Sequence, residues 1–172
     1  MSATGLDVFD KTVQTTNIWL DEIMARLGPD RRLAWHTLGA VLRSLRDRLP
    51  LGEAAHLGAQ LPLLVRGLYY GEWHPASGIR KDRHLEAFLA HVAEEMNGAR
   101  PVDIKEAVRA VFRVLDEHIA AGQAQKVASS LPAEIRVLWP RAGETRTTGG
   151  SERVGAGGAG GGDGAMLTRS EG

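Results

Sequence analysis

A Leu-Pro pair interrupts an apolar, helix-like run at Leu61-Pro62, and a second pair, Leu131-Pro132, does the same 70 residues later. Proline ends a helix because it has no N–H to donate and because its ring collides with the preceding turn. The first position of a new helix accepts proline, since the N–H at that position is unpaired anyway. Each pair therefore predicts a corner between two short helices. A single kinked helix is the alternative that the sequence leaves open.

The segments around the two corners are alike, which indicates an internal repeat. When residues 40–69 are shifted by 70 positions, ten of the thirty residues are identical. The identical pairs are Ala40/Ala110, Val41/Val111, Arg43/Arg113, Leu45/Leu115, Gly52/Gly122, Ala54/Ala124, Leu61/Leu131, Pro62/Pro132, Arg66/Arg136 and Leu68/Leu138. Upstream the shift becomes 69, which one extra residue in the second inter-helix linker explains. The sequence thus predicts a duplication, with halves of about residues 6–72 and 79–140.

Apolar spacing identifies the elements of each half. A stripe at i, i+3, i+4, i+7 and i+11 is typical of one buried helix face. Its members are Leu38, Val41, Leu42, Leu45 and Leu49, and then Val108, Val111, Phe112, Leu115 and Ile119. We therefore expect an all-α fold, an internally duplicated helical bundle over residues 1–140. Each half would hold two long helices and a short Pro-started helix pair.

The composition changes after Pro140. Residues 141–172 hold 11 of the 21 glycines and very few large apolar side chains. Such a segment buries too little apolar surface to offset its ordering entropy, so we expect a disordered Gly-rich tail.

Several motifs carry a resemblance to a known family. The first half contains Ala40–Leu49, Gly52–Ala54, Leu61-Pro62 and Arg66–Tyr70, and Trp73 follows. A related stretch runs from Leu131-Pro132 to Trp139. This combination resembles a bacterial family, domain of unknown function 2267, over about residues 6–139. The resemblance implies an all-helical fold, and it implies no activity.

The charge balance argues against a nucleic-acid partner. The chain has 21 Lys+Arg and 21 Asp+Glu, whereas nucleic-acid-binding proteins usually carry a basic excess. One short window is basic. It holds Arg26, Arg31, Arg32, Arg43, Arg46 and Arg48 against Asp30 and Asp47. We interpret this window as a solvated helix face, with a phosphate-binding face as the alternative.

Residue types and patterns that are absent from the sequence exclude several kinds of site and of protein. There is no cysteine, so disulfides, thiolate metal sites and cysteine nucleophiles are ruled out. The N-terminus has no leader pattern, and no run of 18 or more apolar residues occurs. We therefore expect a cytoplasmic protein with no membrane partner.

The candidate binding residues are Tyr69, Tyr70, Trp73 and His74, at the end of the first half. The second half ends at Trp139-Pro140 without an equivalent group. Amphipathic aromatics at a corner suit a binding surface or a small-molecule cleft. The alternative is that they cap the core where the two halves meet.

No catalytic or metal-binding constellation is recognisable. His84, His91 and Glu95 share the flank of one predicted helix, and we interpret them as a surface ion-pair face. HExxH and paired ExxH motifs are absent. We therefore expect no catalytic residue, no metal site and no cofactor, and we lean against an enzyme.

The sequence favours a non-enzymatic helical protein-interaction or adaptor module with a protein partner. A terminal short motif at Met166 and Leu167 is one way to address such a module, and a homo-oligomer is compatible with it. The alternative is a small-molecule-binding or enzymatic helical domain that uses the aromatic corner from Tyr69 to His74.

Overall fold

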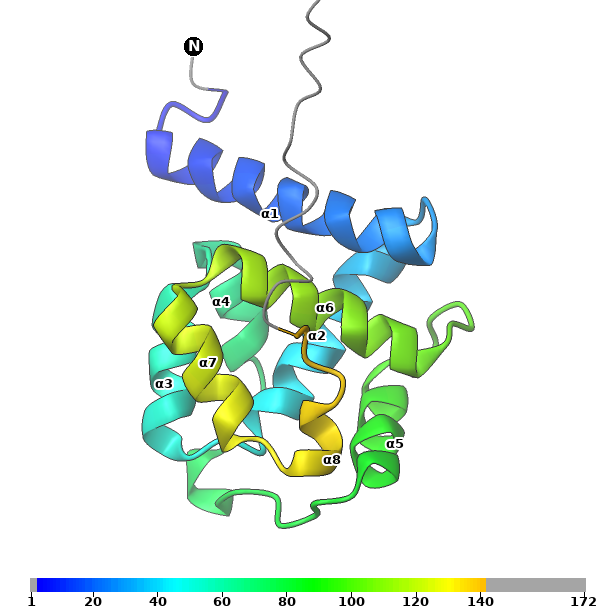
Figure 1. Ribbon diagram of the computed structural model, residues 1–172. Helices are drawn as coiled ribbons and strands as arrows, with labels where there is room; N and C mark the ends of the chain where they lie inside the picture. Colours follow the sequence, from blue (N-terminus) through cyan, green and yellow to red (C-terminus); the bar gives the residue numbers. More distant parts are fainter. Residues whose placement is uncertain (1–2, 142–172) are drawn as a thin grey trace, which may run out of the picture.

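Residues 3–141 are described by the computed structural model, and this part of the chain is all-α without any strand, as the sequence predicts (Figure 1). The helices of these residues are α1 (Asp7–Leu27), α2 (Arg31–Arg46), α3 (Leu51–Gln60), α4 (Leu63–Tyr70), the 3-10 helix η1 (Pro75–Ser77), α5 (Leu85–Glu95), α6 (Ile104–His118), α7 (Ala121–Ser130) and α8 (Ala133–Arg136). The predicted tail, residues 141–172, lies outside the described residues except for Arg141.

Helices α2 and α6 form the centre of the packing. They contact each other, and both contact α1 and α5. All ten residues of the two predicted stripes are buried, and eight of them lie on α2 and α6, whereas Leu49 and Ile119 follow the ends of these helices. Both α2 and α6 begin at an aspartate cap. Asp30 accepts the N–H of Leu33, and Asp103 accepts the N–H groups of Lys105 and Glu106. Such caps satisfy backbone donors that have no partner inside the helix.

Both Leu-Pro pairs are corners between separate helices. Helix α3 ends at Gln60, Leu61 is extended (φ −79°, ψ 146°), and α4 begins at Leu63. Leu131 has nearly the same backbone angles (φ −78°, ψ 146°) between α7 and α8. Extended backbone is what the residue before a proline prefers. The structure therefore contains two helices at each corner and not one kinked helix.

An arginine ties each corner together. Nε of Arg66 donates to the carbonyl of Gly58 at 2.9 Å, and its Nη2 donates to Ala59 and Leu61. Arg136 makes the corresponding three hydrogen bonds in the second corner, to the carbonyls of Ala128, Ser129 and Leu131. The acceptors lie at the C-terminal ends of α3 and α7, where backbone carbonyls run out of intrahelical partners; the carbonyls of Gly58 and Ala128 also accept the N–H groups of Leu61 and Leu131.

The two halves differ in detail although their corners match. Helix α4 has 8 residues and α8 has 4. The internal duplication itself, and a single domain over residues 1–140, stay predictions. One hydrophobic core cluster nevertheless includes side chains from Trp19 to Trp139.

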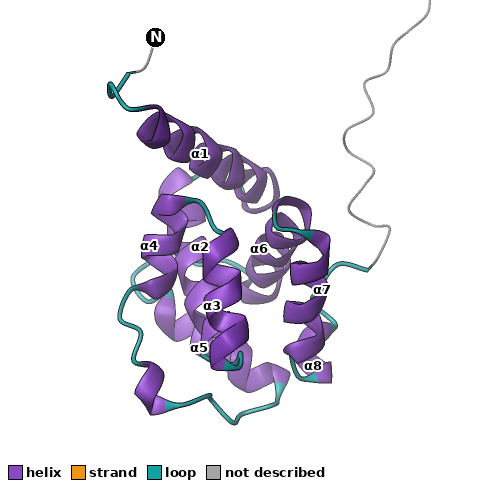
Figure 2. Cartoon of the chain, turned by 90° about the vertical axis from the view of Figure 1, so that its left-hand side faces the viewer, coloured by secondary structure: helices purple, strands orange, loops and turns teal. Residues whose placement is uncertain are grey.

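Helix α1 lies across one end of the molecule, and its N-terminal end points away from the other helices (Figures 1 and 2). Its buried residues begin at Thr12 and end at Ile23. Among the described helices, none is both long and apolar enough to cross a membrane.

Candidate functional site

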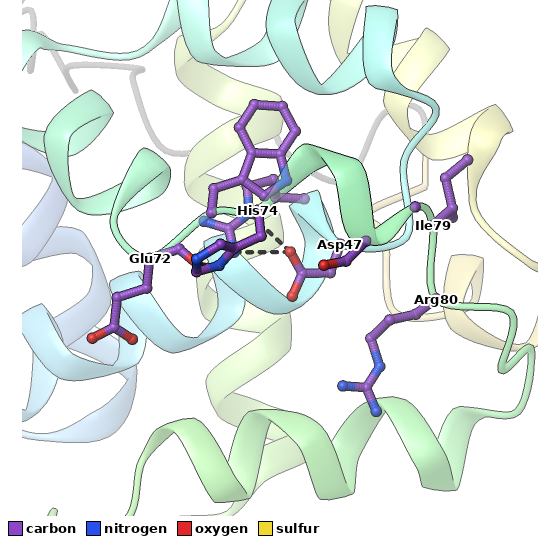
Figure 3. A pocket seen from close by; sticks show the side chains of 9 residues that line it. Asp47, Glu72, His74, Ile79 and Arg80 are labelled. Carbon is purple, nitrogen blue, oxygen red and sulfur yellow. Dashed lines mark hydrogen bonds and ion pairs between the residues drawn. The ribbon is translucent and has the colours of Figure 1, made fainter.

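The linker that follows α4 encloses a cavity of about 260 Å³ against the C-terminal end of α2 (Figure 3). The cavity is partly open to solvent, and its walls are more polar than apolar. Its lining residues are Arg46, Asp47, Glu72, Trp73, His74, Ser77, Gly78, Ile79 and Arg80. The volume lies just below the roughly 300 Å³ at which small-molecule pockets usually begin.

Local backbone geometry places the linker there. Helix α4 ends at Tyr70, and Glu72 then adopts a left-handed conformation (φ 55°) that is uncommon for a residue with a side chain. The turn η1 follows, and Gly78 leaves it with φ 75°. The N–H of Arg80 donates to the carbonyl of Asp47 at 2.8 Å, which fixes the end of the linker on α2.

Arg46 holds the other side of the cavity. Its Nη1 donates to the carbonyls of Tyr69 and Gly71 at 2.6 and 3.0 Å, and its Nε donates to Asp47 at 2.9 Å. The guanidinium thus satisfies carbonyls at the end of α4, where no intrahelical partner exists.

The predicted solvated face is wrong for two arginines of the basic window. Arg46 and Arg48 are each only 4% exposed. No local pattern indicates this burial, because it arises where the linker returns over the C-terminal end of α2 and the residues that follow it.

The four predicted binding residues lie in different environments: two of them line the cavity and two do not. Tyr69 is fully buried, and its hydroxyl donates to the carbonyl of Ala54 at 2.6 Å, so it belongs to the core. Burial raises the pKa of Tyr69. Tyr70 is half-buried and does not line the cavity, whereas Trp73 and His74 do.

Trp73 combines packing with a place on the cavity wall. Its ring stacks on Tyr70 with centroids 5.5 Å apart and an interplanar angle of 24°. The guanidinium carbon of Arg46 lies 5.6 Å from the Trp73 centroid, at cation–π distance. His74 is exposed, and its Nδ1 lies 3.0 Å from the carbonyl of Glu72, so Nδ1 carries the proton of this hydrogen bond.

The charged groups of the cavity do not converge. Asp47 is paired with Arg46. The side chains of Glu72 and Arg80 extend to different sides of the cavity (Figure 3). General acid–base chemistry needs a donor and an acceptor within reach of one reacting atom. The charged side chains that line this cavity therefore form no such donor–acceptor pair.

A second buried polar group lies behind the linker, where the sequence predicted a surface. His91 is only 8% exposed, which makes the predicted surface ion-pair face wrong for this residue. Nη1 of Arg48 donates to Nδ1 of His91 at 3.1 Å and to the carbonyl of Ser44 at 3.0 Å. Nη2 of Arg48 lies 2.8 Å from Asp82, without the alignment of a hydrogen bond. Burial is the main cause that lowers the pKa of Arg48, and Asp82 opposes it.

An exposed apolar stripe lies at the N-terminal end of α1. Leu6, Phe9 and Val13, which we call the α1 seam, are 52%, 46% and 44% exposed. Their spacing of three and then four residues is that of a coiled-coil contact. The same spacing continues along α1 through Thr16, Leu20 and Ile23, which are buried against the body. The seam is thus the uncovered continuation of a core-facing stripe.

Two leucines lie beside the seam. Leu63 and Leu64 begin α4 and are about half exposed. The N–H of Leu64 donates to the hydroxyl of Thr12 at 3.2 Å, which joins the start of α4 to α1. Neither the seam nor these leucines were singled out from the sequence, because periodicity alone does not show where the body ends.

A family comparison covers most of the chain. The family described as "Uncharacterized conserved protein (DUF2267)" matches residues 16–138. The chain belongs to this family. The DUF2267 match includes the linker cavity and the buried Arg48 and His91, and it begins after the α1 seam. A search of curated proteins finds no match.

Proposed function

We propose that this DUF2267 protein is a non-enzymatic helical interaction module that binds through the α1 seam and that its partner is a second copy of the chain. The observation that carries the proposal is the exposure of Leu6, Phe9 and Val13 on an otherwise core-facing stripe. A helix with apolar residues at the same spacing fills such a seam. The chain itself carries one, in α1.

The size of the surface supports this partner. The three seam residues together with Leu63 and Leu64 present on the order of several hundred Å² of surface. Two copies that bury this surface approach the roughly 1,000 Å² that a specific interface needs. A two-fold pair presents the same patch on both subunits, with the α1 helices antiparallel and Phe9 near the axis because it is the middle residue of the seam.

Sedimentation equilibrium of the full chain tests the proposal. We expect a dimer for the natural sequence and at least about a hundredfold weaker association for Phe9→Asp, because a buried carboxylate is placed at the centre of the contact. Ile18→Asp is the matched control, since Ile18 is 43% exposed on α1 but lies off the seam. A monomer at all concentrations, or an equal effect of both substitutions, contradicts the proposal.

The linker cavity supports a second candidate, a small polar ligand held beside Trp73 and His74. The observation that favours it is the half-open cavity with two arginines in its wall, Arg46 and Arg80. Amide chemical-shift titration with a library of small polar fragments tests it. Shifts confined to residues 71–80 and lost in His74→Ala support the candidate, and the absence of any such fragment contradicts it.

A cytoplasmic location, a partner contact through the aromatic corner from Tyr69 to His74 and an address at Met166 and Leu167 are separate predictions from the sequence, and the proposed pairing through the α1 seam does not depend on them. The last two residues lie outside the described residues.

A further inference from the structure

Three potential metal ligands meet where α1 crosses the end of α6. Glu22 comes from α1, and Glu117 and His118 are the last two residues of α6. Their ligand atoms all lie within 4.8 Å of one another. Nε2 of His118 lies 2.8 and 2.9 Å from the two carboxylate oxygens of Glu22. Glu22 and His118 are 96 residues apart in the chain, so no sequence motif announces the group.

The imidazole is held in place by packing. The ring of His118 lies against the buried ring of Trp19, with centroids 5.5 Å apart and an interplanar angle of 30°. Trp19 is one turn before Glu22 on α1, so one helix supplies both the wall and a carboxylate. A supported imidazole that presents one nitrogen to a carboxylate is a preorganised ligand pair.

We propose that Glu22, Glu117 and His118 bind one divalent transition-metal ion of the Zn²⁺ type. One imidazole nitrogen and two carboxylates are a donor set that Zn²⁺ accepts, with water at the remaining position. Ligands at about 2.0–2.2 Å from Zn²⁺ lie roughly 3.3 Å apart in a tetrahedron. The exposed side chain of Glu117 has room to close that distance, and the ion would replace the direct contact between His118 and Glu22.

The position on the fold favours a cation. The group sits at the C-terminal end of α6, where the helix dipole is negative. Mg²⁺ and Ca²⁺ prefer all-oxygen sites with more ligands, so the imidazole selects against them. A bound ion joins α1 to α6 and fixes the helix that carries the α1 seam. The site is independent of whether the seam binds a second copy.

Calorimetric titration of the untagged full-length chain with ZnCl₂ tests the site. We expect one ion per chain, and roughly tenfold or greater weakening of zinc affinity in Glu117→Gln, because a direct ligand is lost. This variant leaves the contact between His118 and Glu22 intact, so the fold is retained, and a circular dichroism melt checks this.

The chain contains a matched control. His84 and Glu134 form another exposed histidine–glutamate pair, with Nδ1 and Oε1 3.3 Å apart. Glu134→Gln should leave zinc binding unchanged, and His118→Gln should weaken it as Glu117→Gln does. The proposal is overturned if zinc does not bind, if Glu117→Gln binds zinc as the natural chain does, if Glu134→Gln is equally impaired, or if Mg²⁺ binds as tightly.

Discussion

Nη1 of Arg48 lies 3.1 Å from Nδ1 of the buried His91, and this contact determines which imidazole nitrogen carries the proton. A guanidinium only donates hydrogen bonds, so Nδ1 accepts and the neutral ring carries its proton on Nε2. A protonated ring would turn this hydrogen bond into a contact between two cations.

The first prediction concerns pH. Burial lowers the pKa of His91 below its ordinary value of 6.5, Arg80 and Arg48 lower it further, and Asp47 and Glu95 oppose them. Below pH 6.5 the unfolded chain therefore binds more protons at this residue than the folded chain does. The stability contribution of His91 is complete above that pH and is lost as the pH falls towards the lowered pKa, by at most about 1.4 kcal/mol per pH unit.

Urea unfolding at several pH values, compared with His91→Asn, isolates this effect. The asparagine amide oxygen accepts from Arg48 but does not titrate. We expect the free energy of unfolding to fall more steeply for the natural chain than for the variant as the pH drops from 7 through 6 to 5. Parallel profiles for the two proteins would show that His91 is not responsible.

The second prediction concerns the buried Arg46. Arg46→Ala removes hydrogen bonds to the carbonyls of Tyr69 and Gly71 and leaves Asp47 without its partner. We expect a loss of roughly 2–4 kcal/mol in the free energy of unfolding. Arg32→Ala, at an exposed position of the same helix, should cost less than about 0.5 kcal/mol. Similar small losses at both positions would place Arg46 on the surface.

The third prediction concerns the core. Leu45→Ala and Leu115→Ala should each lower the free energy of unfolding by roughly 2–5 kcal/mol, since both side chains are fully buried. Leu51→Ala is the control, because Leu51 is largely exposed. Chemical denaturation measures all three. Losses below about 0.5 kcal/mol at the buried positions are incompatible with the packing of α2 and α6.

The fourth prediction concerns the backbone at Glu72. Its φ of 55° is a conformation that glycine adopts without steric cost. Glu72→Gly should therefore be about 0.5–1 kcal/mol more stable than Glu72→Ala, which keeps the Cβ and its strain. Thermal melts of the two variants give the comparison, and a less stable glycine variant would refute the assigned conformation.

The sequence predicted the helices and the corners because both depend on local chemistry. Proline at 62 and 132 breaks a helix wherever it lies, and the stripes around Leu45 and Leu115 are set by the helical period. The aromatic residues from Tyr69 to Trp73 were singled out for a different reason, because the chain has few aromatics and three of them occur within five residues.

The burial of polar residues was not predictable in this way. Arg48 and His91 become neighbours only when α5 packs on α2, and Glu22 meets His118 only across the contact of α1 and α6. Tyr69 and Trp73 are equally aromatic in the sequence, but Tyr69 lies on α4 with its ring in the core, whereas Trp73 follows the end of α4 and lies on the cavity wall. Packing between helices that are distant in the chain decides which of these side chains are buried. No local spacing of residues in the sequence indicates that packing.

Disulfide formation by single-cysteine variants measures directly whether two chains pair through the α1 seam. The chain has no cysteine of its own, so each variant carries one thiol. We expect Phe9→Cys, near the two-fold axis, to form a covalent dimer under mild oxidation, while Ile18→Cys stays monomeric on a non-reducing gel. Equal crosslinking of the two variants, or none in Phe9→Cys at concentrations where the natural chain sediments as a dimer, would contradict this pairing.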